Sequence, residues 1–410
     1  MAVDCEVSVI IPTFRAGKDL LQCLESIAKD VDAPAHEVLV VFNSPVPPPA
    51  GLDLTEYHPT ARIVEAGSNL GFAAGCNLGA SEAVGRTLAF INDDMTVRAG
   101  WMKSLVKPIL DGECAATGGM ILSSDGKKID FDGSSINLLG WGFQAGHGDR
   151  LLDDGFVTHQ DLPFACGGNF AIKTDIFEHA SRAGVAEPCG FDRDYFAFYE
   201  DVDLGWRLML MGYAIEYVHD AVVLHAGGAT GSLIESPLKW FLQERNALQT
   251  IIKNYSDDLF REILPIALAM VGVRSQILSV VDVYEIATDR VWRDLILSDL
   301  GSIKHEHLSG LDEIMHNVRD LGKSVKSGMR KTSGWLAHES RAQAGLLALE
   351  WCLDNWDELM EKRARVQELR VKSDREILPL FGDPLRPVLG HPREVEAMKP
   401  LEKILNEFMK

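Results

Sequence analysis

The sequence is poor in positive charge and has no long hydrophobic run. Its 410 residues include 40 Lys and Arg against 60 Asp and Glu, which gives a formal net charge of −20 at pH 7. A field of this sign repels phosphate backbones and argues against nucleic acid as a partner. The most apolar later stretch covers only residues 263–273, whereas a bilayer-spanning helix needs about 20 apolar residues. We therefore expect no transmembrane span, while peripheral membrane contact stays open.

Paired or clustered cysteines are also missing. The seven cysteines are scattered and never occur as C-x-x-C, which argues against a disulfide framework or a zinc cluster and indicates a reducing compartment. The N-terminal segment MAVDCEVSVIIP carries acidic residues where a secretory signal peptide has a basic region. The sequence therefore predicts a cytoplasmic protein, at most peripheral at the inner face of the cell membrane.

The first half of the chain alternates between strand and helix patterns. Short β-branched apolar runs predict buried strands, and segments with apolar residues at helical spacing lie between them. This alternation predicts an α/β fold with a mostly parallel sheet, whose ligands bind at the carboxyl ends of the strands. The predicted strands are residues 6–11, 37–42, 61–65 and 87–91, and the predicted helices are residues 17–29, 72–84 and 100–110.

The sequence changes character at about residue 235, where long segments with helical periodicity and few glycines begin. We predict an α/β domain over residues 1–254 and a helical region over residues 255–410. The amphipathic faces of these helices could pack within the chain, pair two subunits into a homodimer or rest on a membrane surface. Packing within the chain is the more common case.

Two acidic segments are candidates for chemistry. Asp93 and Asp94 follow a buried strand, and adjacent carboxylates repel each other unless a cation such as Mg²⁺ or Mn²⁺ compensates their charge. A polar loop explains this segment equally well. Glu200 and Asp201 precede an amphipathic helix among aromatic residues, where an acid either caps the helix or, with a raised pKa, accepts a proton.

Two further segments are weaker signals when taken alone. Glycines recur through residues 67–79 at the start of a predicted helix, where a glycine lets the backbone approach a ligand, although a tight turn with helix–sheet packing is the more common reason for such glycines. His225 ends an apolar strand and precedes two glycines. A lone histidine is more often structural, and His225 gains functional meaning if it faces Asp94.

Taken in order, six segments resemble the inverting family-2 glycosyltransferases with a GT-A fold, in particular their rhamnosyltransferase-like branch. The segments are VSVIIPTFRAGKDLLQCLESI, NLGFAAGCNLG, INDDM, GGNFAIKTDIF, GFDRDYFAFYEDVDLGWRLMLMGY and VVLHAGG.

The resemblance implies a role for each matching position. Asp94 and His225 bind Mn²⁺ or Mg²⁺, and Asp201, with Glu200 beside it, acts as the general base that takes the proton of the acceptor hydroxyl. The residues expected around the nucleotide-sugar donor are Thr13, Arg15, Asn43, Asn69, Gly71, Asp93, Gly168, Asn169 and Arg207. The donor is a nucleoside-diphosphate hexose or deoxyhexose, with rhamnose as one candidate, and the acceptor is a glycan or a lipid-linked glycan of the cell envelope.

The sequence departs from the family at the nucleobase. Family members usually place Asp at the end of the second strand, where this chain has Phe42 followed by Asn43. Either the Phe42 ring stacks on the base, or Asn43 replaces the missing carboxylate. The change also keeps open a non-catalytic sugar-binding or scaffold protein of the same fold. A sugar nucleotidyltransferase is a further alternative, which the single glycine of PTFRAGKD disfavours.

Overall fold

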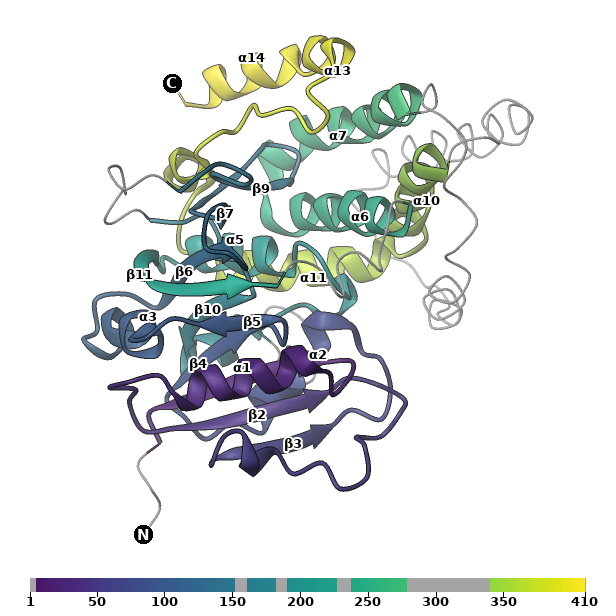
Figure 1. Cartoon of the computed structure of the whole chain (residues 1–410). Helices are drawn as coiled ribbons and strands as arrows, with labels where there is room; N and C mark the ends of the chain where they lie inside the picture. Colours follow the sequence, from purple (N-terminus) through teal and green to yellow (C-terminus); the bar gives the residue numbers. More distant parts are fainter. Residues whose placement is uncertain (1–4, 152–160, 182–189, 227–236, 279–339, 410) are drawn as a thin grey trace.

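The computed structural model describes residues 5–151, 161–181, 190–226, 237–278 and 340–409 (Figure 1). The strands are β1 (Val7–Thr13), β2 (His36–Phe42), β3 (Ala61–Glu65), β4 (Thr87–Ile91), β5 (Met95–Val97), β6 (Ala116–Ser123), β7 (Ile129–Phe131), β8 (Ser134–Ile136), β9 (Gly142–Gln144), β10 (Asn169–Lys173) and β11 (Ile215–His225). The α-helices are α1 (Lys18–Ala28), α2 (Gly71–Ser81), α3 (Trp101–Leu110), α4 (Thr174–Ser181), α5 (Glu200–Leu210), α6 (Pro237–Asn254), α7 (Asp257–Leu278), α10 (Ser340–Asp354), α11 (Trp356–Leu369), α12 (Asp374–Ile377), α13 (Pro392–Ala397) and α14 (Lys399–Phe408).

The main sheet has the strand order β3-β2-β1-β4-β10-β6-β11-β5, with β7 paired to β6. Strands β1, β2, β3, β4, β6 and β11 run in one direction, whereas β10 is antiparallel to both of its neighbours. Every residue of β4 is buried, as expected for a parallel strand covered on both faces. The predicted α/β architecture with a mostly parallel sheet is confirmed, as are the four predicted strands and three predicted helices, each within a few residues.

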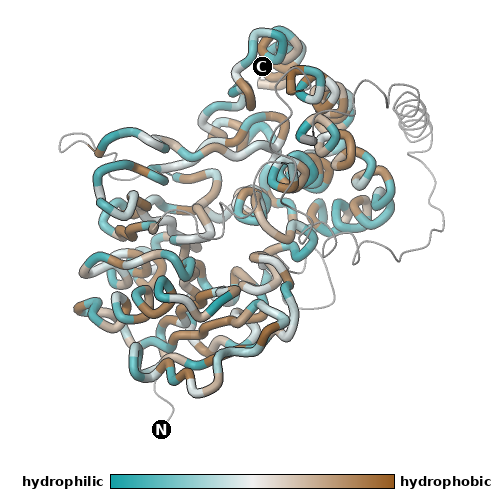
Figure 2. Tube along the Cα trace, turned by 45° about the vertical axis from the view of Figure 1, so that its right-hand side comes forward, coloured by the Kyte–Doolittle hydropathy of each residue, from teal (hydrophilic) through white to brown (hydrophobic). Residues whose placement is uncertain are grey.

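The helical region packs directly on the α/β part. Helix α6 packs against α5 and also against α7, α10 and α11, and the upper half of Figure 1 shows these helices side by side above the sheet. Hydrophobic segments gather in the interior of the molecule in Figure 2. The predicted helical C-terminal region is therefore present, and its buried residues join those of the sheet in one hydrophobic core.

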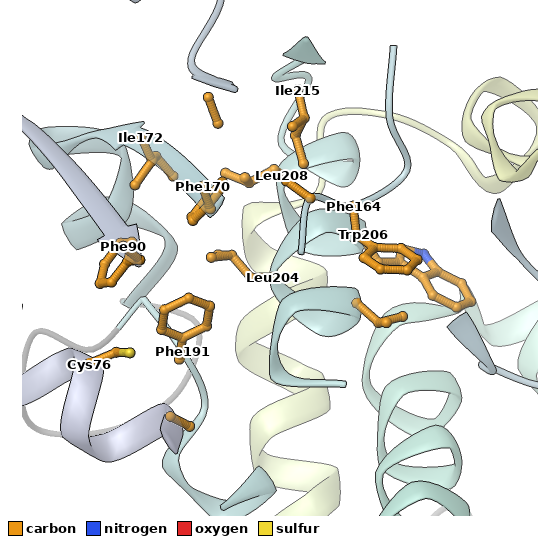
Figure 3. Packing of buried hydrophobic residues seen from close by; sticks show 14 of the residues in the cluster. Cys76, Phe90, Phe164, Phe170, Ile172, Phe191, Leu204, Trp206, Leu208 and Ile215 are labelled. Carbon is orange, nitrogen blue, oxygen red and sulfur yellow. The ribbon is translucent and has the colours of Figure 1, made fainter. Parts of the chain in front are cut away.

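Helix α5 contacts both the sheet and the helical region. Leu204 of α5 lies beside Phe170 and Phe191 under the sheet (Figure 3). The Trp206 ring packs edge-on against Tyr255 and Phe381, with ring centroids 4.8 and 4.7 Å away. One buried indole thus contacts aromatic residues from two separate later segments of the chain.

None of the helices in the described part of the chain is both long enough and apolar enough to span a membrane. Arg274, near the C-terminal end of helix α7, is buried and paired with Glu244.

Replacing Trp206 by alanine is expected to destabilise both regions together. Loss of a buried aromatic side chain costs about 3–5 kcal/mol of unfolding free energy, and Trp206 supports both parts. Chemical denaturation followed by circular dichroism and by tryptophan fluorescence is expected to give coincident transitions at lower denaturant concentration. Val46, which is 68% exposed, provides the control, because Val46→Ala is expected to change stability by less than about 0.5 kcal/mol. A denaturation midpoint for Trp206→Ala equal to that of the parent would contradict a hydrophobic core shared by the two regions.

Candidate functional site

The carboxyl ends of β1 and β4 bring the first candidate residues together. The two strands are parallel neighbours, and the Thr13 hydroxyl lies 2.5 Å from Asp93 Oδ2. The same hydroxyl lies 2.7 Å from the carbonyl oxygen of Arg15, whose side chain is exposed. Burial raises the pKa of Asp93 to about 6, against the opposing effect of the Thr13 hydrogen bond. Thr13, Arg15 and Asp93 therefore lie together at this end of the sheet.

Asp94 faces His225 across the antiparallel pair of β5 and β11. Because His225 pairs with Met95 in this register, its Nε2 atom lies 3.2 Å from Asp94 Oδ2. Its Nδ1 atom lies 2.6 Å from Asp130 Oδ2. Hydrogen bonds to Asp130 and then to Asp94 raise the pKa of His225 to about 10, so without a metal the imidazole is a cation between two carboxylates.

This arrangement fits a divalent cation bound partly by the protein. The described residues contain no cluster of three or more His, Cys, Asp or Glu side chains arranged to hold a metal ion. Mg²⁺-type sites at diphosphates use one or two protein ligands and complete their coordination with phosphate oxygens and water. Asp94 and His225 Nε2 could supply those ligands, with Asp130 orienting the imidazole through Nδ1, a common arrangement for metal-binding histidines.

The second acidic pair begins helix α5. Asp201 Oδ2 accepts a hydrogen bond from the Gly167 amide at 3.2 Å, and its Oδ1 accepts one from the Val202 amide at 2.8 Å. Asp201 is only partly buried, yet desolvation raises its pKa to about 6. A carboxylate of this pKa is ionised at neutral pH and basic enough to accept a proton.

Glu200 differs sharply from its neighbour. Its side chain is 5% exposed, and its Oε2 atom has no hydrogen-bond partner. Burial, reinforced by the charge of Asp201, raises the pKa of Glu200 well above its ordinary value. Burial thus favours the neutral form of Glu200, whereas Asp201, with a pKa of about 6, is mostly ionised at neutral pH.

Gly167 and Gly168 contact both acidic segments, the one with Asp93 and Asp94 and the one with Glu200 and Asp201. The Gly167 amide binds Asp201, and a Cβ atom at Gly168 would lie 2.9 Å from the Asn92 side chain. Any larger residue at position 168 would collide with the segment that carries Asp93 and Asp94. Gly167 thus contacts Asp201 at the start of α5, and Gly168 contacts Asn92 just after β4.

The predicted glycine-rich segment is held by asparagine side chains. Asn43 donates to the Gly71 carbonyl at 2.7 Å and accepts from the Leu70 amide at 2.7 Å. Asn69 Oδ1 accepts from the Gly71 amide at 3.1 Å. Asn43 and Asn69 thus shape this loop, and both polar atoms of the Asn43 amide are engaged in doing so. Phe42, 3% exposed, belongs to the hydrophobic core, so its ring is not placed to stack on a base.

Two predicted donor-binding residues lie in the interior. Asn169 is fully buried, donates to the carbonyls of Met120 and Ala221, and accepts from Trp101 Nε1. Arg207 is buried as well. Its guanidinium binds Asp203 and the carbonyls of Ala180 and Gly190. These contacts place Asn169 and Arg207 in the framework behind the site.

Asp130 is a residue that sequence reasoning missed. It lies in strand β7, inside an irregular Gly- and Asp-rich stretch where no motif distinguishes it from neighbouring acids. Its second oxygen lies 2.8 Å from His147 Nδ1, and the hydrogen bond with His225 lowers the pKa of Asp130. Only the fold reveals that it supports His225.

Comparison with known proteins gives the same assignment as the motifs. Residues 8–180 match the model of the family described as Glycosyl transferase family 2. An N-acetylglucosaminyl-diphospho-decaprenol L-rhamnosyltransferase of Mycobacterium tuberculosis is 24% identical, over 53% of this chain and 75% of its own. The glycosyltransferase AglE of Haloferax volcanii is 22% identical, over 57% and 71% respectively.

Solved structures give weaker matches. GalNAc-T7, crystallised with UDP, GalNAc and Mn²⁺, has a TM-score of 0.45 and 15% identity over 66% of this chain, and the match spans 52% of that chain. Residues 1–349 of Staphylococcus aureus TarS give 0.42 and 14% identity over 88% of this chain and 90% of that one. On the family match and the six ordered motifs, residues 8–180 of this chain carry a glycosyl transferase family 2 domain.

Proposed function

We propose that this chain is an inverting, metal-dependent glycosyltransferase that moves a hexose or deoxyhexose from a nucleoside diphosphate to a glycan or lipid-linked acceptor. The observation that carries this proposal is the placement of Asp201, whose pKa is raised to about 6, on the Gly167 amide, while the adjacent Gly168 contacts Asn92 in the segment of Asp93 and Asp94. Rhamnose is the first donor sugar to test, because a relative with 24% identity is named as a rhamnosyltransferase. The relative's decaprenol-linked substrate also suggests an acceptor at the inner face of the membrane.

In the proposed reaction, Asp201 accepts the proton of an acceptor hydroxyl as that oxygen attacks the anomeric carbon. The bond between this carbon and the diphosphate breaks in the same step, so the configuration inverts. Asp94 and His225 would hold Mn²⁺ or Mg²⁺, which supplies positive charge to the departing diphosphate. Thr13 and Asp93 lie beside this position, and Arg15 offers an exposed cation to the nucleotide. Within this proposal, residues 1–254 form the catalytic domain.

Asp201→Asn is expected to abolish transfer while leaving donor binding intact. The amide keeps the side-chain shape but cannot accept the proton, and loss of a general base costs about 10²–10⁴-fold in kcat. Release of nucleoside diphosphate from dTDP-rhamnose and a panel of UDP- and GDP-hexoses measures kcat and donor KM. Asp175, an exposed acid in the first turn of α4, is the matched control, and Asp175→Asn should behave as the parent. Parental turnover by Asp201→Asn would remove the base from the mechanism.

The metal site is tested by Asp94→Ala and Asp130→Asn. Asp94→Ala is expected to eliminate the Mn²⁺-dependent part of UDP or dTDP binding. Asp130→Asn retains both proposed ligands and is expected to weaken Mn²⁺ binding about 10–100-fold, because it loosens the orientation of His225. Titration of Mn²⁺ in the presence of either nucleotide, followed by thermal shift, measures both effects. Asp125→Asn, on an exposed turn, is the control. Equal Mn²⁺ responses in all variants would rule out this site.

The pH profile of kcat is expected to fall on the acidic side with a midpoint near 6. Burial raises the pKa of Asp201 from 3.8 to about 6, and only the ionised form accepts a proton. Activity should therefore be full above this pKa and fall about tenfold per pH unit below it. Asp93 has a similar pKa, but its protonation should weaken donor binding. A change with pH that appears in donor KM but not in kcat would contradict the assignment to Asp201.

A further inference from the structure

The segment that delivers Asp201 to the site has a strained backbone. Phe196 has φ 62° and ψ −66°, and the Ala197 amide donates to the Tyr195 carbonyl at 2.7 Å. This is the rarer, strained form of the γ-turn. Phe198 and Tyr199 also have positive φ, 68° and 67°. Three non-glycine residues thus hold unfavourable conformations directly before Glu200, and such strain persists only where surrounding contacts enforce it.

The enforcing contacts come from helix α6. Asn246 is fully buried, and its amide nitrogen lies 3.0 Å from the Tyr195 carbonyl oxygen, 3.0 Å from that of Ala197 and 2.6 Å from that of Phe198. Its own oxygen is occupied by the Arg245 and Gln249 side chains, at 2.9 and 3.1 Å. The amide is therefore oriented unambiguously, with its nitrogen toward the strained turn.

Arg245, the residue before Asn246 in α6, also binds this segment. Its Nη2 atom donates to the carbonyls of Asp194 and Tyr195 at 2.7 and 2.9 Å. From the opposite side, the Ala73 amide donates to the Phe196 carbonyl at 3.2 Å. A Cβ atom at Gly71 would lie only 2.5 Å from that same carbonyl oxygen. The turn is thus held between the start of α2 and helix α6.

We propose that Asn246 is a positioning residue of the reaction, which acts by fixing the main chain of residues 195–199 and thereby the place of Asp201. The inference rests on the proposed function, since it assigns Asn246 a role in that chemistry. Asn246 lies outside the segment that matches the family model, so helix α6 contributes to the site from beyond that segment. An error of about 1 Å in a catalytic group can cost about 10²-fold in rate.

The test compares Asn246→Ala and Asn246→Asp with Leu248→Ala in the full chain. Aspartate keeps the volume of asparagine but lacks the N–H donors, so it separates hydrogen bonding from packing. Leu248 is a buried apolar residue of the same helix, and its variant controls for a general loss of stability. Turnover of dTDP-rhamnose and the UDP- and GDP-hexose panel gives kcat and donor KM. Hydrogen–deuterium exchange follows the Ala73 and Ala197 amides.

Both Asn246 variants are expected to lose about 10²-fold in kcat, with donor KM within about threefold of the parent. The Ala73 and Ala197 amides should exchange at least about tenfold faster in both, and Leu248→Ala should change neither quantity even where its melting temperature falls further. Parental kcat or parental exchange in Asn246→Asp would overturn the proposal. An inactive parent chain would instead refute the proposed function, and with it the role of Asn246 in catalysis. The exchange data would still report whether Asn246 holds the main chain of residues 195–199.

Discussion

The site depends above all on the antiparallel pairing of β10 with β4. Because Asn169 pairs with Ile91, the residues just before β10 lie beside the residues just after β4. Gly168 lies on one side and Asn92 on the other, and a Cβ atom at Gly168 would lie 2.9 Å from the Asn92 side chain. One reversed strand in a mostly parallel sheet thus sets the spacing between the two acidic pairs.

Burial and hydrogen bonding then give the three acidic residues of helix α5 different environments. Glu200 lies inside the protein without a partner for one oxygen, whereas Asp201 reaches the surface and receives two backbone amides. Asp203, on the same helix, is buried but lies 2.9 Å from both Lys253 and Arg207. Desolvation raises the pKa of all three carboxyls, and their partners decide the outcome: the pKa of Glu200 is raised furthest, that of Asp201 is raised to about 6, and that of Asp203 is lowered by Lys253 and Arg207.

The features that could be predicted from the sequence are local. Buried strands, the acids at the end of β4 and the acids that begin α5 each occupy a few consecutive residues with a recognisable pattern. Asn169 and Arg207 also belong to such patterns, but the direction of their side chains depends on packing, which places them in the interior. Asp130 and Asn246 act through contacts with residues distant in sequence, and nothing in their neighbouring residues signals those contacts.

The hydrogen bonds from Asn246 hold the main chain of the turn and do not involve its side chains. All three of these contacts are with carbonyl oxygens, which every amino acid possesses. The path of the chain before Glu200 is therefore specified without reference to the side chains of residues 197 and 198, both of which are partly exposed. The side chains at those two positions can therefore be replaced without removing the hydrogen bonds that hold the main chain beneath them.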